Sequence, residues 1–353
     1  MRMEKSSLPS FYSILTKSGV SIVKLQLRAK GLSSIFFDSK DYSIIEVMYM
    51  PVLKKRKWIL SLSAVVLIVA AAVSIFIQII LHSNVPEPAE GSIEQRYAEQ
   101  GSYQVKVEEV KNTLDAALFR IYYPAFQKGE SYPVISWGNG TDATPDRYDE
   151  LLTHLASWGF IVIDSYSKTT GTGKEIVEAI EYLINENERA SSLFYQKINT
   201  ENIGVAGHSQ GSTGVINAHT NYTKGSLIKT VVSIALPDLK YCDPEDVYDT
   251  ARITVPFLIM GGTRDFLISP LSANQLAFYT TKTGTPVMMG MAKGAAHTAI
   301  EGNGGNHRGY LTAWMRYQLL DDQEAMKAFY GSSPEMMDNS NWVDVIQANM
   351  NVQ

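Results

Sequence analysis

Short apolar runs alternate with amphipathic stretches beyond residue 100. Short apolar runs without a polar face indicate buried strands, and apolar residues three or four apart indicate helices packed on a core. The predicted strands are residues 103–110, 116–123, 132–137, 160–163, 203–206, 231–235, 256–260 and 286–291. The predicted helices are residues 148–157, 176–183, 271–280 and 309–320, with one more directly after residue 209. This alternation predicts an α/β domain with a doubly wound, mostly parallel sheet covered by helices on both faces.

A long apolar segment precedes this domain. Residues 58–81 carry no charged side chain, and residues 54–57 directly before them are all Lys or Arg. About 20 apolar residues in a helix span a bilayer, and a positive cluster favours the cytoplasmic side. The segment is longer than the apolar core of a cleaved signal peptide, which is the alternative interpretation. We therefore expect one uncleaved transmembrane anchor in the cell membrane, with the α/β domain on the extracytoplasmic side.

This anchor divides the chain into segments. Residues 1–57 are expected to form a basic cytoplasmic segment, in which residues 1–48 are either part of the protein or a spurious upstream extension. Residues 82–97 include a linker rich in Pro and Glu, a composition typical of semi-rigid spacers. Residues 98–330 are expected to form the α/β domain, and residues 331–353 a C-terminal tail.

The charge of the chain bears on its partners. The net charge is −5, but residues 1–57 hold eleven Lys and Arg against four Asp and Glu, which gives +7 and leaves −12 for the rest. Such an acidic domain argues against nucleic acid as a partner. Cys242 is the only cysteine, so the chain forms no internal disulfide and no cysteine-based metal cluster. No metal-ligand spacing is visible either, and we expect no metal.

One pentapeptide stands between a short apolar strand and a helix start, and it reads Gly207-His-Ser-Gln-Gly211. It matches the pattern G-x-S-x-G of a nucleophile elbow, in which the serine lies at the tip of a strained turn. The flanking glycines let the strand and the helix approach each other closely. The pattern predicts Ser209 as a nucleophile, with Gly207 and Gly211 as the glycines of the elbow.

A serine nucleophile requires a histidine that accepts its proton and a carboxylate that fixes the tautomer of that histidine. In elbow folds the order along the chain is Ser, acid, His. Asp265 ends the loop after predicted strand 256–260, where catalytic groups collect in open α/β sheets. We expect Asp265 to be the acid, and we interpret its rivals Asp238, Asp243 and Asp246 as solvated loop charges.

Two of the six histidines follow Asp265 in the chain, His297 and His307. His297 lies in a loop of small residues after the last predicted strand, which is the position expected of the base. His307 lies at the start of the last predicted helix and is expected to be a cap or a surface group. The side chain of His208, within the elbow, is expected to pack beneath the site.

An oxyanion that forms during acyl transfer requires two backbone N–H donors. Gln210, the first residue after the serine, is expected to supply one donor. The glycine-rich loop 138–141 after the predicted strand 132–137 is expected to supply the other. We favour the amide of Thr141 and keep the amide of Gly140 as the alternative.

These positions resemble the α/β-hydrolase family, and within it the branch of cutinase-like polyester hydrolases, chlorophyllase-like esterases and dienelactone-hydrolase-like esterases. The resemblance covers about residues 103–322, and it rests on Gly207–Gly211, Asp265, His297 and the segments 139–143 and 155–163. It implies ester hydrolysis through an acyl-enzyme on Ser209, without a cofactor.

Two positions depart from this branch. Its oxyanion loop often carries an aromatic residue where this chain has Thr141, and its polyester hydrolases carry a Trp where this chain has Leu236-Pro-Asp238. About 19 residues separate Ala235 from Val255, which leaves no room for a large cap domain and predicts an open site. We therefore expect a membrane-anchored serine esterase that prefers short acyl groups and cleaves polyester poorly.

Two other function classes stay open from the sequence. An acyltransferase or a serine peptidase uses the same three residues, and product analysis with alcohol acceptors and peptides separates these from an esterase. A non-catalytic binding protein can keep the fold without the chemistry. Covalent labelling of Ser209 by a fluorophosphonate excludes that class.

Overall fold

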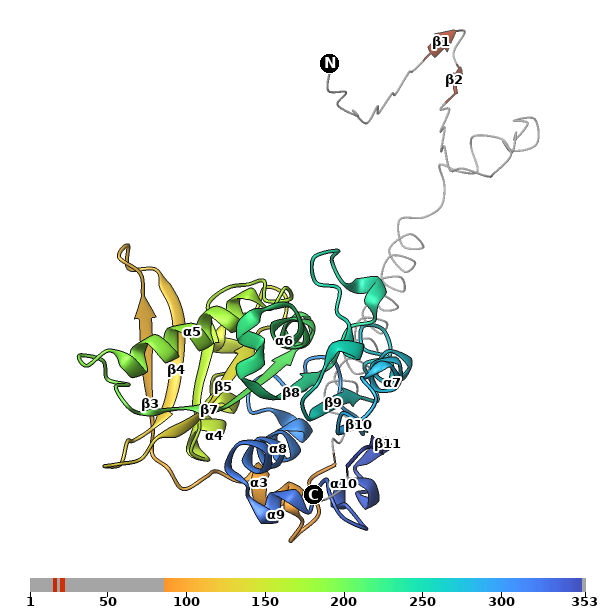
Figure 1. Cartoon of the computed structure of the whole chain (residues 1–353). Helices are drawn as coiled ribbons and strands as arrows, with labels where there is room; N and C mark the ends of the chain where they lie inside the picture. The colour runs from red at the N-terminus through yellow and green to blue at the C-terminus, as the bar shows by residue number, and fades with distance from the viewer. Residues whose placement is uncertain (1–14, 18–19, 23–85, 351–353) are drawn as a thin grey trace, which may run out of the picture. The chain divides into compact units, whose positions relative to one another are not determined.

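Figure 1 shows the computed structural model of the chain, which describes residues 15–17, 20–22 and 86–350. Strands β1 (Leu15–Lys17) and β2 (Val20–Ile22) pair with each other in antiparallel fashion. Residues 86–350 belong to a second compact unit, which contains all the other described elements.

The predicted fold class is wrong in its transmembrane helix. Among the described residues, no helix is both long enough and apolar enough to cross a membrane. Residues 58–81, where the anchor was expected, lie outside the described residues. The structure agrees with the rest of that prediction, the α/β domain.

The second unit is built on a nine-stranded sheet in the order β11-β10-β9-β8-β7-β5-β6-β4-β3. The strands from β10 to β6 in this order run parallel. At one edge β11 pairs antiparallel with β10, and at the other β4 pairs antiparallel with both β6 and β3. The strands are β3 (Val105–Lys111), β4 (Ala117–Pro124), β5 (Tyr132–Gly138), β6 (Ile161–Ser165), β7 (Ile198–His208), β8 (Ile228–Ile234), β9 (Phe257–Gly262), β10 (Val287–Ala292) and β11 (Trp342–Ala348).

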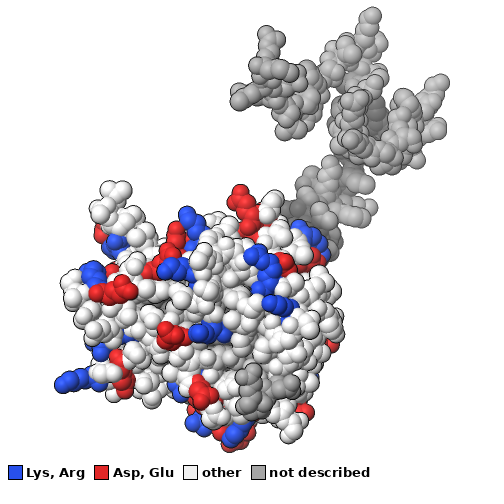
Figure 2. Space-filling model, in the orientation of Figure 1, with Lys and Arg blue, Asp and Glu red and all other residues white. Residues whose placement is uncertain are grey.

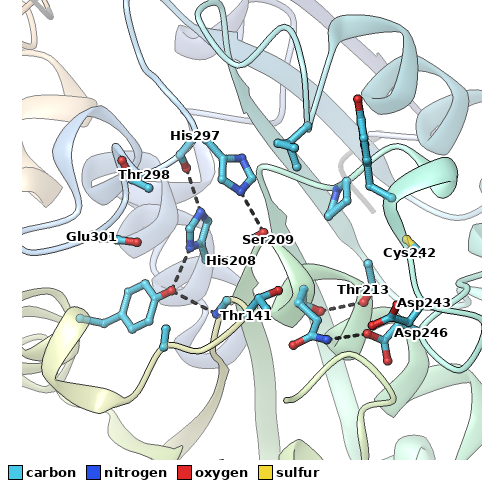
Figure 3. Close-up of a pocket in the computed structure, with 17 residues that line it drawn as sticks. Thr141, His208, Ser209, Thr213, Cys242, Asp243, Asp246, His297, Thr298 and Glu301 are labelled. Atoms are coloured by element: carbon cyan, nitrogen blue, oxygen red, sulfur yellow. Dashed lines mark hydrogen bonds between the residues drawn. The ribbon is translucent and has the colours of Figure 1, made fainter. Parts of the chain in front are cut away.

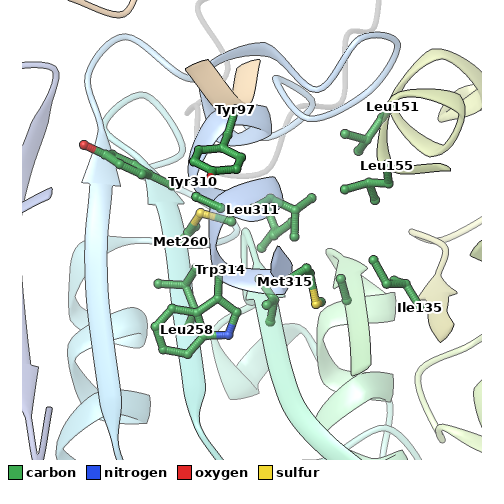
Figure 4. Close-up of a cluster of buried hydrophobic side chains, with 14 of the residues drawn as sticks. Tyr97, Ile135, Leu151, Leu155, Leu258, Met260, Tyr310, Leu311, Trp314 and Met315 are labelled. Atoms are coloured by element: carbon green, nitrogen blue, oxygen red, sulfur yellow. The ribbon is translucent and has the colours of Figure 1, made fainter. Parts of the chain in front are cut away.

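Helices cover both faces of this sheet and bury two separate apolar clusters. One face carries α3, α4 and α8, and Figure 4 shows Leu311, Trp314 and Met315 of α8 in one cluster with the sheet residues Leu258 and Met260. The other face carries α5, α6 and α7. The helices are α3 (Ile93–Ala98), α4 (Asp149–Ser157), α5 (Lys174–Glu188), α6 (Gln210–Asn221), α7 (Leu271–Thr280), α8 (Arg308–Leu320), α9 (Gln323–Met326) and α10 (Glu335–Asp338).

Burial on both faces explains why the strand signal in the sequence is a continuous apolar run. Every residue of β5 is buried, with Val134 in one cluster and Ile135 in the other. Successive side chains of a strand point to opposite faces, so a strand covered on both sides needs apolar residues at each position.

The domain extends further at both ends than the sequence predicts. Within the predicted tail 331–353, the described residues 331–350 contain α10 and β11, and β11 pairs with β10 through Trp342 and its neighbours. Similarly, α3 begins inside the predicted linker 82–97, and its Tyr97 is fully buried. The predicted domain 98–330 is therefore too short at both ends.

The connection from β8 to β9 is short. Residues 235–256, all of which are described, contain two 3₁₀ helices, η3 (Leu239–Tyr241) and η4 (Thr250–Arg252), and no larger insertion. The carboxyl ends of the central strands are thus left without a cap domain from this connection.

Candidate active site

The residues expected to carry the chemistry follow neighbouring parallel strands. Ser209 follows β7, Asp265 follows β9, His297 follows β10 and Thr141 follows β5. The carboxyl ends of parallel strands meet at one edge of a sheet, where binding and catalytic groups collect in open α/β folds. The topology therefore brings four segments that are far apart in the sequence to one place.

Ser209, His297 and Asp265 form a continuous hydrogen-bonded chain. The Oγ of Ser209 lies 2.8 Å from Nε2 of His297, and Nδ1 of His297 lies 2.5 Å from Oδ2 of Asp265. Figure 3 shows the bond between Ser209 and His297. Oδ1 of Asp265 accepts the amide N–H of Ser269 at 3.1 Å, which holds the carboxylate in place. Nδ1–H donates to this carboxylate, so Nε2 is left to accept the serine proton.

Ser209 lies on a sharply turned backbone. Its φ of 54° is in the left-handed region, which a residue with a side chain occupies at a cost. An added Cβ on Gly207 would lie 2.3 Å from the carbonyl oxygen of Gly211, and one on Gly211 would lie 2.0 Å from the carbonyl oxygen of Gly138. Both glycines are needed because strand, helix and oxyanion loop meet here. This is the elbow that the pentapeptide predicts.

A cavity of about 470 Å³ opens in front of Ser209. Its wall includes residues of the loop 138–141 after β5 (the oxyanion loop), the elbow 207–211, the loop 293–304 after β10 (the histidine loop) and the β8–β9 connection. The lining residues are Gly140, Thr141, Ala143, Tyr148, His208, Ser209, Gln210, Thr213, Pro237, Tyr241, Cys242, Asp243, Asp246, Ile268, His297, Thr298 and Glu301.

The amides of the oxyanion loop differ in their partners. The N–H of Gly140 donates to the hydroxyl oxygen of Tyr148 at 3.1 Å. Within residues 86–350, the amides of Thr141 and Gln210 donate to no protein acceptor, and both residues line the cavity beside Ser209. Two unpaired N–H groups next to a serine hydroxyl can together bind a negatively charged oxygen.

Asp246 is not the solvated charge that was expected. It is buried, and its Oδ2 accepts Nε2 of Gln210 at 2.6 Å, while Oε1 of Gln210 accepts the amide of Thr170 at 3.4 Å. Burial raises the pKa of the Asp246 carboxyl. The contact fixes the side chain of the residue after the nucleophile, and no local sequence signal marks it.

His307 is also not at the surface. It is buried, its Nε2–H donates to the carbonyl oxygen of Gly261 at 3.2 Å, and burial lowers its pKa to about 4. It does not line the cavity, whereas His297 does. His208 also lines the cavity, and it bonds to Tyr148 and to the backbone of His297.

The thiol of Cys242 is a second potential nucleophile in the cavity wall. Burial raises its pKa to about 11, so the thiol stays protonated at neutral pH and is a poor nucleophile. Among the described residues, no group of three or more His, Cys, Asp or Glu side chains is arranged to hold a metal ion.

Comparison with known proteins finds a matching family and related ester hydrolases. A family model described as "PETase: PET hydrolase-like" matches residues 81–348. Cutinase est1 of Thermobifida alba is 26% identical over 262 residues, which cover 70% of this chain and 80% of that protein. Cutinase 1 of Thermobifida cellulosilytica is 27% identical over 208 residues, 56% of this chain and 70% of that protein. Bis(hydroxyethyl) terephthalate hydrolase of Streptomyces coelicolor is 24% identical over 255 residues, 69% of this chain and 75% of that protein.

Fold, elbow and relatives define the class of protein as an α/β-type carboxylic ester hydrolase. The chain belongs to the PET hydrolase-like family. The predicted resemblance to the cutinase-like branch is confirmed, as is the prediction of an enzyme. A non-catalytic binding protein is set aside, because the relatives are named as ester hydrolases.

Proposed function

We propose that the protein hydrolyses short-chain carboxylic esters through an acyl-enzyme on Ser209. The 2.8 Å contact between Oγ of Ser209 and Nε2 of His297, at a strained elbow facing the cavity, is the observation that carries the proposal. His297 takes the serine proton as general base while Oγ attacks the ester carbonyl carbon. Asp265 holds the tautomer of His297 and stabilises the imidazolium that forms.

The carbonyl oxygen becomes negatively charged in this step. The amides of Thr141 and Gln210 are the donors that we assign to it, because both are unpaired within residues 86–350 and both line the cavity. His297 then returns the proton to the leaving alcohol. A water molecule, activated by the same histidine, releases the acid from Ser209 and restores the enzyme.

The preference for short acyl groups follows from the shape of the site. The β8–β9 connection adds no cap, so only the cavity wall encloses a bound acyl chain. Pro237, in the segment after β8, is part of this wall. Each methylene that is fully buried contributes about 0.8 kcal/mol, and a partly exposed chain gains less. We expect kcat/KM to be highest for acyl groups of about two to six carbons, and insoluble polyester film to be cleaved poorly.

Two experiments on p-nitrophenyl esters test these assignments. Ser209→Ala and His297→Ala should each lower kcat by orders of magnitude, and Asp265→Asn by about 10⁴-fold if it acts through the tautomer as in well-studied triads. His307→Gln, the control, should retain activity. Loss of activity in His307→Gln with an active His297→Ala would disprove the assigned base. In the acyl series, a steady rise of kcat/KM up to about twelve carbons would indicate a deep acyl tunnel and contradict the short-chain preference.

An acyltransferase or peptidase on the same residues stays the alternative. Assays with alcohol acceptors and peptide substrates separate these activities from hydrolysis. The extracytoplasmic location and an association with the membrane stay predictions from the sequence, since the segment that suggested them lies outside the described residues.

A further inference from the structure

Two buried side chains connect the loops of the site. The hydroxyl of Tyr148 lies 3.1 Å from the amide nitrogen of Gly140 and 2.8 Å from Nδ1 of His208. Nε2 of His208 lies 2.8 Å from the carbonyl oxygen of His297. Tyr148 is fully buried and His208 is 2% exposed. The oxyanion loop, the elbow and the histidine loop are therefore joined by one chain of hydrogen bonds, and Figure 3 shows its dashed lines around His208.

The direction of each bond in this chain is determined by its ends. A carbonyl oxygen only accepts, so Nε2 of His208 carries the proton and donates to His297. Burial lowers the pKa of His208 to about 3, so the ring is neutral at working pH and Nδ1 has a free lone pair. The hydroxyl of Tyr148 must then donate to Nδ1, and its oxygen accepts the N–H of Gly140.

With these directions, no N–H or O–H group of this hydrogen-bond chain is left to donate to the substrate. The hydroxyl proton of Tyr148 is committed to His208, and the N–H of Gly140 is committed to Tyr148. The amide of Thr141, the next in the loop, remains unpaired within the described residues. At its other end the hydrogen-bond chain contacts the backbone carbonyl of His297, and the imidazole of His297 bonds to Ser209.

We infer that Tyr148 and His208 are positioning residues that lock the oxyanion loop and the histidine loop onto the elbow, with His208 acting as a neutral linker. This inference rests on the proposed function of Ser209, His297 and Thr141. The linked groups touch no reacting atom. They fix where the Thr141 amide and the His297 ring stand, which matters because misplacement by about 1 Å can cost a hundredfold in rate.

The first test replaces the hydroxyl of Tyr148. Tyr148→Phe keeps the buried ring but leaves both Gly140 N–H and His208 Nδ1 without their partner. We expect kcat per active site, counted by fluorophosphonate titration, to fall about 10- to 100-fold. This fall is no larger than the one caused by removal of an oxyanion donor. KM on small esters should change less than about threefold. The affinity of a boronic acid, which forms a tetrahedral adduct with serine, should fall by a similar factor.

Tyr122→Phe is the matched control. Tyr122 is also fully buried, and its hydroxyl bonds to Oδ1 of Asp149 at 3.0 Å, outside the cavity. Its loss should lower the melting temperature but leave kcat and boronate affinity unchanged. Equal effects of the two substitutions on kcat would show that Tyr148 is only structural and overturn the inference.

A second pair of variants addresses His208 in case Tyr148→Phe fails to fold. The amide of Gln offers an N–H donor and an oxygen acceptor in place of the ring's N–H donor and nitrogen acceptor, whereas Leu offers neither. We expect His208→Gln to retain more than about a third of kcat and His208→Leu to lose about 10-fold or more. Similar kcat values in the two variants would overturn the role of His208.

The outcomes also separate this inference from the proposed function. If wild-type protein hydrolyses no ester and Ser209 takes no fluorophosphonate, the proposed function fails. If wild-type protein is active and Ser209→Ala is inactive, but Tyr148→Phe retains full kcat and boronate affinity, the proposed function holds and the positioning role fails.

Discussion

At the scale of single residues, the sequence identifies those whose role follows from a local pattern or from chain order. Ser209 and its glycines are marked by the pentapeptide, and Asp265 and His297 by their places after predicted strands. Their roles as a triad stay predictions that the 2.8 Å and 2.5 Å contacts support. The same reasoning misjudges Asp246, because its burial depends on packing between segments distant in the sequence.

Buried histidines predict how stability depends on pH. Burial lowers the pKa of His154 to about 4, and its Nε2 bonds to the carbonyl of Tyr97 and to the hydroxyl of Thr312. Between about pH 6.5 and pH 4 the unfolded chain binds a proton at this position that the folded chain does not. The contribution of His154 to stability is therefore lost as the pH falls through this range, by up to about 1.4 kcal/mol per pH unit.

His154→Gln isolates this effect. Glu94 and Asp164 have raised pKa values, which act in the opposite direction, so comparison of variants is more informative than the total slope. In urea unfolding at pH 4.5–6, we expect the slope of the unfolding free energy against pH to be smaller in His154→Gln than in the wild type. The difference should approach the contribution of one bound proton, about 1.4 kcal/mol per pH unit. Leu155→Ala destabilises the same helix without removing a titratable group and should keep the wild-type slope. An unchanged slope in His154→Gln would show that the imidazole is protonated in the folded state.

At the scale of elements, the central strands and the long helices are predictable because burial on one or both faces leaves a periodic signal. β11 and α3 leave a weak signal. Most positions of β11 are only partly buried and include Asp344 and Gln347, and α3 has six residues. Their places are set by contacts across the whole length of the chain, which a local pattern cannot reveal.

Glu335 provides such a contact. Its two carboxylate oxygens accept the amides of Ile93 at 2.6 Å and Glu94 at 2.9 Å in the first turn of α3, and the hydroxyl of Tyr310 at 3.0 Å. An acidic side chain at a helix start satisfies free N–H groups and interacts well with the helix dipole. The carboxylate thus attaches α3 to the carboxyl-terminal part of the domain.

Glu335→Ala should lower the free energy of unfolding by about 1–2 kcal/mol, the range for loss of a helix cap, and leave kcat unchanged because Glu335 does not line the cavity. Urea denaturation and an ester assay measure the two effects. Glu324→Ala, which removes an exposed ion pair with Lys327, should cost less than about 1 kcal/mol. Equal losses in both variants would contradict a capping role for Glu335.

At the scale of the whole molecule, acidic and basic side chains are interspersed on the face shown in Figure 2. The cavity differs from this surface. Its described lining residues include three carboxyl groups, from Asp243, Asp246 and Glu301, and none of these lining residues is Lys or Arg. Burial raises the pKa of the Asp246 carboxyl, and Glu301 forms an ion pair at 3.0 Å with Arg147, which does not line the cavity.

This charge pattern predicts which esters enter the site. A substrate that carries its own carboxylate meets like charges there, and repulsion across a partly enclosed cavity is screened less than at the surface. We expect kcat/KM for a neutral diester to exceed that for its anionic monoester by about tenfold or more at low salt, and the ratio of the two values to shrink as ionic strength rises. Asp243→Asn should narrow the ratio by raising activity on the monoester, and Glu301→Gln should narrow it less, because Arg147 already pairs with the Glu301 carboxylate. Asp115→Asn, at an exposed position outside the cavity, should leave the ratio unchanged. Equal kcat/KM for both esters at low salt, with no response to Asp243→Asn or Glu301→Gln, would show that the bound ester lies beyond the field of these carboxylates.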